Sequence, residues 1–183
     1  MLKLKTGDCV QGNVFNDNYK NVKFYKFLNK NLTHNKFTYK IGLNIDNIPF
    51  NPSGKCCSGG LYFCSEHDAY HHWDSYEEAF VAEVIIPDDA LVYIEECKFK
   101  TDKLILTNIT EFNAIKDEFW LNIIPYSEMA IKYIKNQTDE ICKLAVQQNG
   151  NTLEYVKNQT DEICKLAVQQ NGKALEYVKN QTD

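Results

Sequence analysis

The chain has 183 residues, of which 44% are hydrophobic, so it can form one or two small domains with a packed core. Its formal net charge is −5, from 25 acidic and 20 basic residues, and no segment is strongly basic, which argues against nucleic acid as a partner. Arginine is absent, so any mechanism that needs a bidentate guanidinium group is excluded.

The cysteine content and the hydropathy pattern bear on the compartment. The number of cysteines is seven, which is odd, and the N-terminal MLKLKTGD contains no apolar signal region. No apolar run reaches the roughly 18 residues of a membrane span. We therefore expect an intracellular protein with reduced thiols and no membrane partner.

The first half of the chain predicts a small sheet with short helices. Residues 1–18 are polar and predict an irregular segment, whereas 19–31 predict a short amphipathic helix. Runs of β-branched and aromatic residues predict strands at 36–45, 61–64, 80–86, 91–94 and 103–106. Helices are predicted at 66–76, with Ser65 as its N-cap, and at 111–122, covering one face of the sheet.

An internal repeat begins after Pro125. The string KNQTDEICKLAVQQNG occupies residues 135–150 and recurs unchanged at 157–172, and Tyr133, Tyr155 and Tyr177 give the period, since 155 − 133 = 177 − 155 = 22. Each unit has the pattern of a helical hairpin. Thr138 and Thr160 are predicted N-caps, and Gly150 is a predicted left-handed residue that ends the helix.

These patterns predict an α+β protein with two parts. Residues 1–123 form a domain with a small mixed or antiparallel sheet, and residues 124–183 form a short α-helical hairpin repeat array of period 22. A helical hairpin cannot bury its apolar face alone and must stack on a neighbour. The edge of the last repeat is therefore expected to be an apolar surface that a partner chain or a longer parent protein would cover, and self-association of the chain through it is a further hypothesis.

Residues 52–73 concentrate reactive side chains. The span holds three of the seven cysteines and three of the four histidines, and His67 and His71 form an i, i+4 pair. A zinc site is one hypothesis, a Cys/His nucleophile is another, and an ordinary core with surface histidines is the third. The possible metal ligands are Cys56, Cys57, Cys64, His67 and His71.

The same span has a second interpretation. The run GGLYF at residues 59–63, followed by Ala69 and Tyr70, resembles the pattern on which ADP-ribosyltransferases hold the nicotinamide ring of NAD. The resemblance implies that Tyr62 and Tyr70 sandwich the ring, that His34 binds the ribose, and that Glu83, or else Glu95 or Glu96, polarises it. The sequence departs from that family at Asn35, where the family has glycine after the histidine.

A wider resemblance rests on HNKFTYKIGLNIDNIPFNPSGKCCSGGLYFC and VIIPDDALVYIEECKFKTDKLIL. These stretches, with their GLN, GGLYF, VIIPDDA and KFKTDK motifs, resemble a domain of uncharacterised giant DNA virus proteins of the mimivirus type. In such proteins the domain commonly precedes ankyrin or other helical repeats, and the tail of this chain is similar to their short repeats. The resemblance implies no established activity, and it implies a location in the host cytoplasm or the virion.

We therefore expect a non-enzymatic viral adaptor that binds viral or host proteins through its helical repeats, with no cofactor. The alternative is an ADP-ribosyltransferase-like NAD-binding enzyme, or a degenerate relative, that uses the GGLYF region. A cleft lined by His34, Tyr62 and Tyr70 would favour the enzyme, and a filled core at these positions would favour the adaptor.

Overall fold

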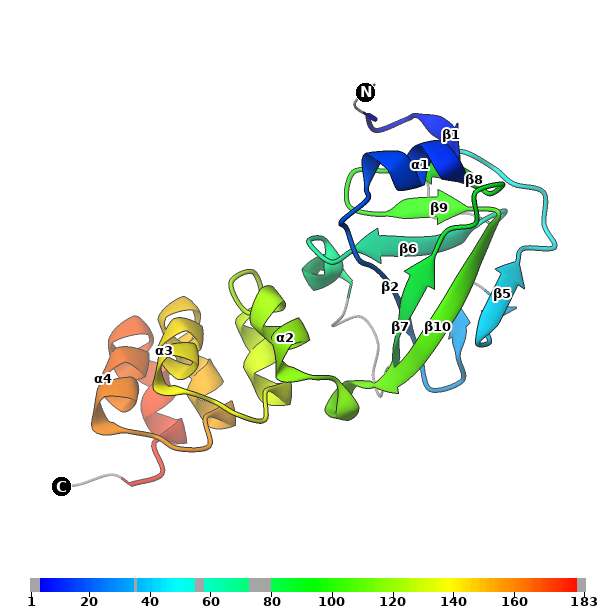
Figure 1. Ribbon diagram of the computed structural model, residues 1–183. Helices are drawn as coiled ribbons and strands as arrows, with labels where there is room; N and C mark the ends of the chain where they lie inside the picture. The colour runs from blue at the N-terminus through cyan, green and yellow to red at the C-terminus, as the bar shows by residue number, and fades with distance from the viewer. Residues whose placement is uncertain (1–3, 35, 55–57, 73–79, 181–183) are drawn as a thin grey trace. The chain divides into compact units, whose positions relative to one another are not determined.

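The structure is a computed structural model that describes residues 4–34, 36–54, 58–72 and 80–180. It confirms an α+β fold, with strands in the first part of the chain and helices in the last (Figure 1). The chain divides into two compact units, Met1–Ala114 and Ile115–Asp183. In the part of the chain that is described, no helix has both the length and the apolar character needed to cross a membrane.

The first unit is built on an eight-stranded sheet in which every pairing is antiparallel. Its strand order is β1-β8-β9-β6-β2-β7-β10-β5, and a separate two-stranded ribbon pairs β3 with β4. The strands are β1 (Cys9–Gln11), β2 (Phe24–Leu28), β3 (Thr33–His34), β4 (Phe37–Thr38), β5 (Gly42–Ile45), β6 (Leu61–Ser65), β7 (Phe80–Ile85), β8 (Leu91–Ile94), β9 (Phe99–Thr101) and β10 (Lys103–Glu111).

Aromatic rings fill the core of this unit. Phe15, on helix α1 (Gly12–Asn18), is fully buried, and its ring centroid lies 5.1 Å from that of Phe24 and 5.1 Å from that of Phe99. Phe63 joins the cluster at 5.8 Å from Phe15. The pairs of Phe15 with Phe63 and Phe99 are edge-to-face and the pair with Phe24 is tilted, and aromatic pairs contribute about 0.5–1.5 kcal/mol each beyond the area they bury. The cluster ties α1 to the middle of the sheet.

The strands predicted at 61–64, 80–86, 91–94 and 103–106 are confirmed, but two predictions for the N-terminal segment are wrong. Residues 1–18 contain β1 and α1, and the centre of the predicted 19–31 helix is strand β2. All five residues of β2 are buried, because side chains cover both of its faces. Phe24 and Leu28 belong to the core, and Phe27 packs against Phe112. A strand that is buried on both faces lacks the alternation of apolar and polar residues that marks a half-buried strand. The aromatic and lysine residues of this segment were therefore compatible with a helical pattern.

Two predicted helices also differ in extent. The segment predicted as a helix at 66–76 contains one turn of 3-10 helix, η1 (Ala69–His71), and residues 73–76 lie outside the described residues. The helix predicted at 111–122 is the shorter α2 (Asp117–Ile123). It belongs to the second unit, where it packs on the 3-10 helix η4 (Glu128–Tyr133).

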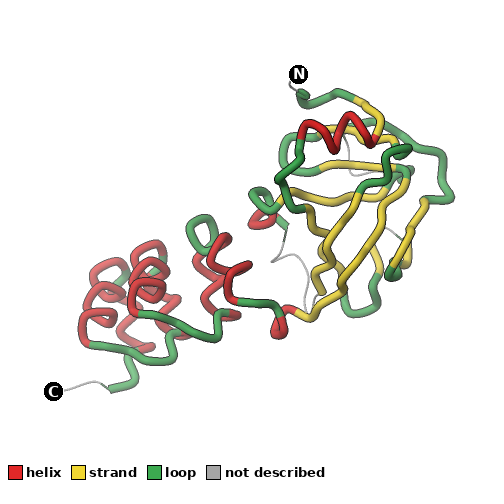
Figure 2. Tube along the Cα trace, in the orientation of Figure 1, coloured by secondary structure: helices red, strands yellow, loops and turns green. Residues whose placement is uncertain are grey.

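The described part of the second unit consists of helices and loops (Figure 2). After α2 and η4 come α3 (Asp139–Gln148), η5 (Gly150–Tyr155), α4 (Asp161–Gln170) and η6 (Gly172–Tyr177). The starts of α2, α3 and α4 are 22 residues apart, as are those of η4, η5 and η6. Residues 115–136 are therefore a first, divergent repeat, followed by the repeats at 137–158 and 159–180.

This first repeat explains why the unit begins at Ile115, whereas the verbatim repeat suggests a boundary at 123/124. Residues 115–136 share with the later repeats the acidic pair at the helix start, the Tyr133 position and the Lys135–Asn136 pair. Their apolar positions carry larger side chains, and Trp120 stands where the next repeat has Cys142. The first repeat keeps the 22-residue spacing but few of the repeated residues, so comparison of the sequences of the repeats did not detect it.

A glutamine joins each repeat to the one before it. The Nε2 group of Gln137 donates to the carbonyl oxygens of Ile131 and Tyr155, both at 3.0 Å, and its Oε1 accepts from the backbone N–H of Lys157 at 2.8 Å. Gln159 makes the same three bonds one repeat later. The repeated glutamine is thus a structural residue that satisfies backbone groups at the ends of the short helices.

Thr138 and Thr160 are confirmed as N-caps, each accepting a backbone N–H of its helix. The prediction for Gly150 is wrong, because it does not have the positive φ of a left-handed residue and instead begins η5. The glycine is needed there for a different reason. A Cβ atom at Gly150 would lie 2.3 Å from the carbonyl oxygen of Ala167 in the next repeat, whereas at the equivalent Gly172 it would meet nothing within 4 Å.

Replacing Gln137 with alanine should destabilise the array. The substitution removes three hydrogen bonds and leaves part-buried backbone groups without partners, so we expect a loss of about 1–3 kcal/mol in the free energy of unfolding. Urea denaturation followed by circular dichroism measures the loss. The exposed Gln147→Ala serves as the matched control and should change the stability by less than about 0.5 kcal/mol; equal losses in the two variants would contradict the bridging role.

Candidate functional site

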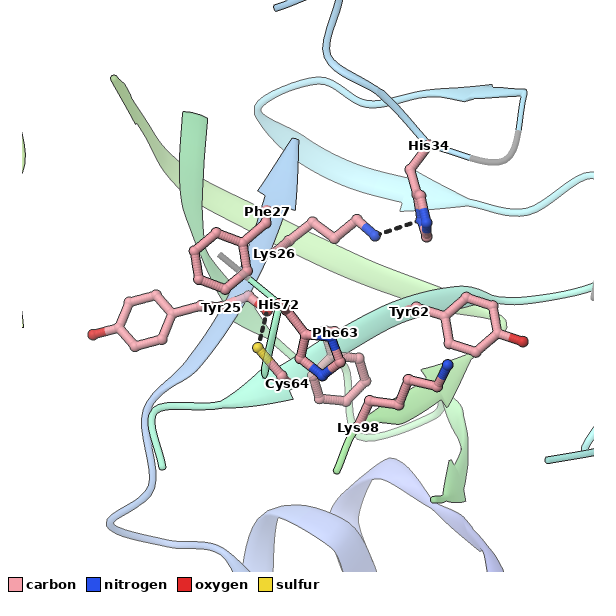
Figure 3. A pocket seen from close by; sticks show the side chains of 9 residues that line it. All are labelled: Tyr25, Lys26, Phe27, His34, Tyr62, Phe63, Cys64, His72 and Lys98. Atoms are coloured by element: carbon pink, nitrogen blue, oxygen red, sulfur yellow. Dashed lines mark hydrogen bonds between the residues drawn. The ribbon is translucent and has the colours of Figure 1, made fainter. Parts of the chain in front are cut away.

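A pocket of about 160 Å³ opens among side chains of β2, β6 and the neighbouring loops (Figure 3). Two of its residues, Lys26 and Lys98, carry ammonium groups, and two, His34 and His72, carry imidazoles. None of the residues that line it within the described ranges is acidic. The lining is Tyr25, Lys26, Phe27, His34, Tyr62, Phe63, Cys64, His72 and Lys98.

The centre of the pocket is a lysine–histidine hydrogen bond. Lys26 is only 3% exposed, and its Nζ lies 2.8 Å from Nδ1 of His34, where it donates to an unprotonated ring nitrogen (Figure 3). Burial, together with the positive charges of Lys26, Lys98 and His72, lowers the pKa of His34 from 6.5 to about 3. His34 is therefore neutral at physiological pH.

Cations also surround the ring of Tyr62. The Nζ of Lys98 lies 4.7 Å from the ring centroid, and that of the buried Lys100 lies 5.3 Å from it while donating to the carbonyl of Asn51 at 2.8 Å. The ring centroid of His34 is 6.2 Å away, in an edge-to-face orientation. The β3–β4 ribbon and strand β6 thus bring His34 and Tyr62 to one pocket.

The other two residues of the NAD-binding interpretation lie elsewhere. Tyr70 is not among the residues that line the pocket, and its ring packs on that of His71 with centroids 3.9 Å apart. Glu83 is on β7 and lies 3.5 Å from the side-chain amide of Asn108. A pocket of about 160 Å³ is also well below the roughly 300–1,000 Å³ of typical cofactor sites. The charge and size of the pocket suit a small anion better than a dinucleotide.

The glycines of the GGLYF motif have a structural explanation. Gly59 has a φ of +85°, and a Cβ atom there would lie 2.4 Å from the carbonyl oxygen of Pro49. Leu61, Tyr62 and Phe63 then enter β6 and are buried. This motif therefore serves a tight turn into a buried strand.

Among the described residues, the predicted metal ligands Cys64, His67 and His71 do not form one cluster of ligand atoms. Cys64 is 2% exposed, its thiol donates to the carbonyl of Tyr25 at 3.6 Å, and burial strongly raises its pKa, all of which describes a core residue. His67 precedes η1 and is exposed, and His71 ends η1. Cys56 and Cys57 lie outside the described residues.

The last repeat exposes an apolar face, and the equivalent face of the second repeat is buried. In the second repeat Cys142 is 2% exposed, and Val146, Leu153 and Val156 are fully buried. The equivalent residues of the third repeat are Cys164, Val168, Leu175 and Val178, and we call these four the open stacking face. Leu175 is 52% exposed, and the other three are half-buried.

The neutral state of His34 predicts sensitivity to acid. Its folded pKa of about 3 lies below its ordinary value of 6.5, so the unfolded chain gains a proton first, and stability should fall progressively as the pH drops from 6.5 towards 3. In His34→Gln the side-chain oxygen can still accept from Lys26 and does not titrate. The loss of unfolding free energy between pH 7 and pH 4.5, from urea titrations, should be smaller in this variant; an equal loss would contradict the account.

Comparison with known proteins gives a match for the C-terminal repeats only. Residues 139–181 match the family model described as "Domain of unknown function (DUF4116)". The matched segment begins at α3 and runs through α4 and η6, so it spans the two repeats of near-identical sequence. No curated protein and no solved structure matches the chain.

Proposed function

We propose that this protein is a non-enzymatic adaptor that binds a partner protein through the open stacking face of its last repeat. The observation that carries the proposal is the contrast between Leu153, which is fully buried, and Leu175, which is 52% exposed in the same local structure. A cluster of half-exposed aliphatic side chains at the end of a solenoid is a surface that a further helical element covers.

The junction between the second and third repeats supports one kind of partner. There the third repeat turns Ile163, Ala167 and Ala174 inward, and all three are fully buried. Helix α4 contacts both α3 and η5 across this junction. Small and aliphatic side chains allow the helices to approach closely, so the partner we propose for the open stacking face is a helical-hairpin repeat with a similar inward face.

Polar contacts at the junction add charge complementarity. Lys143 pairs with Glu162 of the following repeat at 2.7 Å, and Lys179 donates from Nζ to the carbonyl of Val156 at 2.9 Å. In the last repeat the equivalent positions are Lys165, which is exposed, and Val178. The partner repeat should therefore carry a glutamate that reaches Lys165 and a lysine that reaches the Val178 carbonyl.

We also propose that the adaptor is a viral protein. The giant-virus resemblance of the sequence favours a viral adaptor that acts on viral or host proteins inside the host cell or in the virion. The cysteines of the described residues, Cys9, Cys64, Cys97, Cys142 and Cys164, are free thiols, which is compatible with a reducing compartment. The pocket argues against the NAD-binding alternative, because Tyr70 and Glu83 do not line it and its volume is too small for a dinucleotide.

Site-specific crosslinking tests the proposal. A photoreactive phenylalanine analogue replaces Leu175 in one variant and Gln169, an exposed residue of the same repeat, in the control. In cells that contain the full chain, position 175 should crosslink to a partner whose attached peptide lies on the apolar face of a helical hairpin, and position 169 should not. The yield at 175 should fall several-fold when Lys165→Glu is added, since the ion pair with the partner reverses sign.

Two results would contradict this function. Crosslinking at position 175 no stronger than at 169 would show that the open stacking face is not occupied. Crosslinks from 175 to the same face of a second copy would show a symmetric dimer in place of the proposed hairpin partner, and sedimentation of the purified chain would then give a dimer that Lys165→Glu does not dissociate.

A further inference from the structure

Three potential metal ligands that are distant in the sequence meet in the first unit. The side chains of Asp68, His71 and Cys97 each offer one ligand atom, and these atoms all lie within 4.8 Å of one another. Zinc bonds of about 2.0–2.3 Å in a tetrahedral site put neighbouring ligand atoms roughly 3.3–3.8 Å apart. Because His71 is exposed, a small rotation of its side chain can close the difference.

The fold places these residues through two short elements. Asp68 is the N-cap of η1 and His71 is its last residue, and in a 3-10 helix side chains three residues apart lie on the same side. Cys97 lies in the turn between β8 and β9, which the bond from the backbone N–H of Glu95 to the carbonyl of Lys98 closes at 3.0 Å.

Neighbouring contacts hold the two elements together and orient the ligands. The ring Nε2 of His72 donates to the carbonyl of Cys97 at 3.0 Å, which fixes the turn against η1. The Ser65 hydroxyl donates to Oδ2 of Asp68, so Oδ1 is the oxygen that would bind the metal ion. The ring of Tyr70 packs on that of His71. Such supporting contacts are typical of metal sites, in which outer residues fix the ligand side chains.

A second, independent feature points to the same place. His71 and Cys97 line a pocket of about 460 Å³, and Glu95 lines it too. The Glu95 side chain is only 9% exposed; its Oε2 lies 3.6 Å from Nζ of Lys98, and its buried Oε1 has no hydrogen-bond partner among the described residues. A carboxylate beside the pocket contributes negative charge that favours a cation there.

We propose that Asp68, His71 and Cys97 bind a divalent cation of the zinc class, with the fourth coordination position open towards the pocket that Glu95 lines. Sulfur, nitrogen and oxygen ligands together select zinc over magnesium or calcium, which prefer oxygen alone. Three protein ligands with one open position are the arrangement that leaves room for a water or an exogenous ligand on the metal. This set shares only His71 with the ligands expected from the sequence.

Cobalt(II), an absorbing substitute for zinc, tests the site in the full chain with its thiols reduced. One equivalent should give a thiolate-to-cobalt charge-transfer band in the near ultraviolet and visible bands of tetrahedral intensity, and zinc should abolish both by displacement. Cys97→Ser should remove the charge-transfer band, and Asp68→Asn or His71→Ala should weaken cobalt binding at least tenfold. Thermal unfolding of each metal-free variant checks that it is folded.

Matched cysteine variants distinguish this site from the alternatives. Cys9→Ser changes an exposed cysteine of the same unit and should leave the band and the affinity unchanged. Absence of a charge-transfer band in the folded, reduced chain would overturn the proposal. So would retention of the band in Cys97→Ser, or its loss in the double variant Cys56→Ser, Cys57→Ser with Cys97 intact.

Discussion

The organisation of the second unit depends on one constraint, which is that a 22-residue helical hairpin cannot bury its own apolar face. Each hairpin is completed by the next, as the full burial of Leu153 and Val156 in the second repeat shows. The polar residues that recur unchanged serve the same junctions, since Gln137 and Gln159 bridge backbone groups of adjoining repeats. Stacking therefore explains both the apolar and the polar part of the repeated sequence, and it leaves one face of the last repeat exposed.

Sequence pattern predicted the elements that rest on local signals. Strand β7 is rich in β-branched and aromatic residues, and Thr138 caps a helix that begins with an acidic pair, so both could be predicted from neighbouring residues. Strand β2 could not, because the side chains that pack on it, such as those of Phe63 and Phe112, come from distant parts of the sequence. The first repeat was hidden for a different reason: its junctions keep the 22-residue spacing but use larger side chains, such as Trp120, in place of the repeated ones.

The fold brings together some of the residues that the sequence interpretation grouped and separates others. His34 and Tyr62 do meet, because β3 and β6 lie on the two sides of one pocket, but Tyr70 turns towards His71 instead. The i, i+4 pairing of His67 with His71 assumed an α-helix; the 3-10 turn places Asp68 beside His71, and only the fold brings Cys97 to them. Both the type of a short helix and a contact with a distant turn depend on the tertiary structure, and neither can be predicted from the spacing of residues in the sequence.

Thiol labelling compares the two faces most directly, because Cys142 and Cys164 occupy equivalent positions and burial raises the pKa of both. The tryptic peptides that contain them are identical, NQTDEICK, so each cysteine is followed in a variant that lacks the other, Cys164→Ala or Cys142→Ala. In the dilute, folded chain a maleimide should modify Cys164 at least tenfold faster than Cys142, and Leu175→Trp, which covers part of the face, should slow the reaction of Cys164 alone. Equal protection of the two thiols would contradict an open stacking face and, with it, the proposed binding surface.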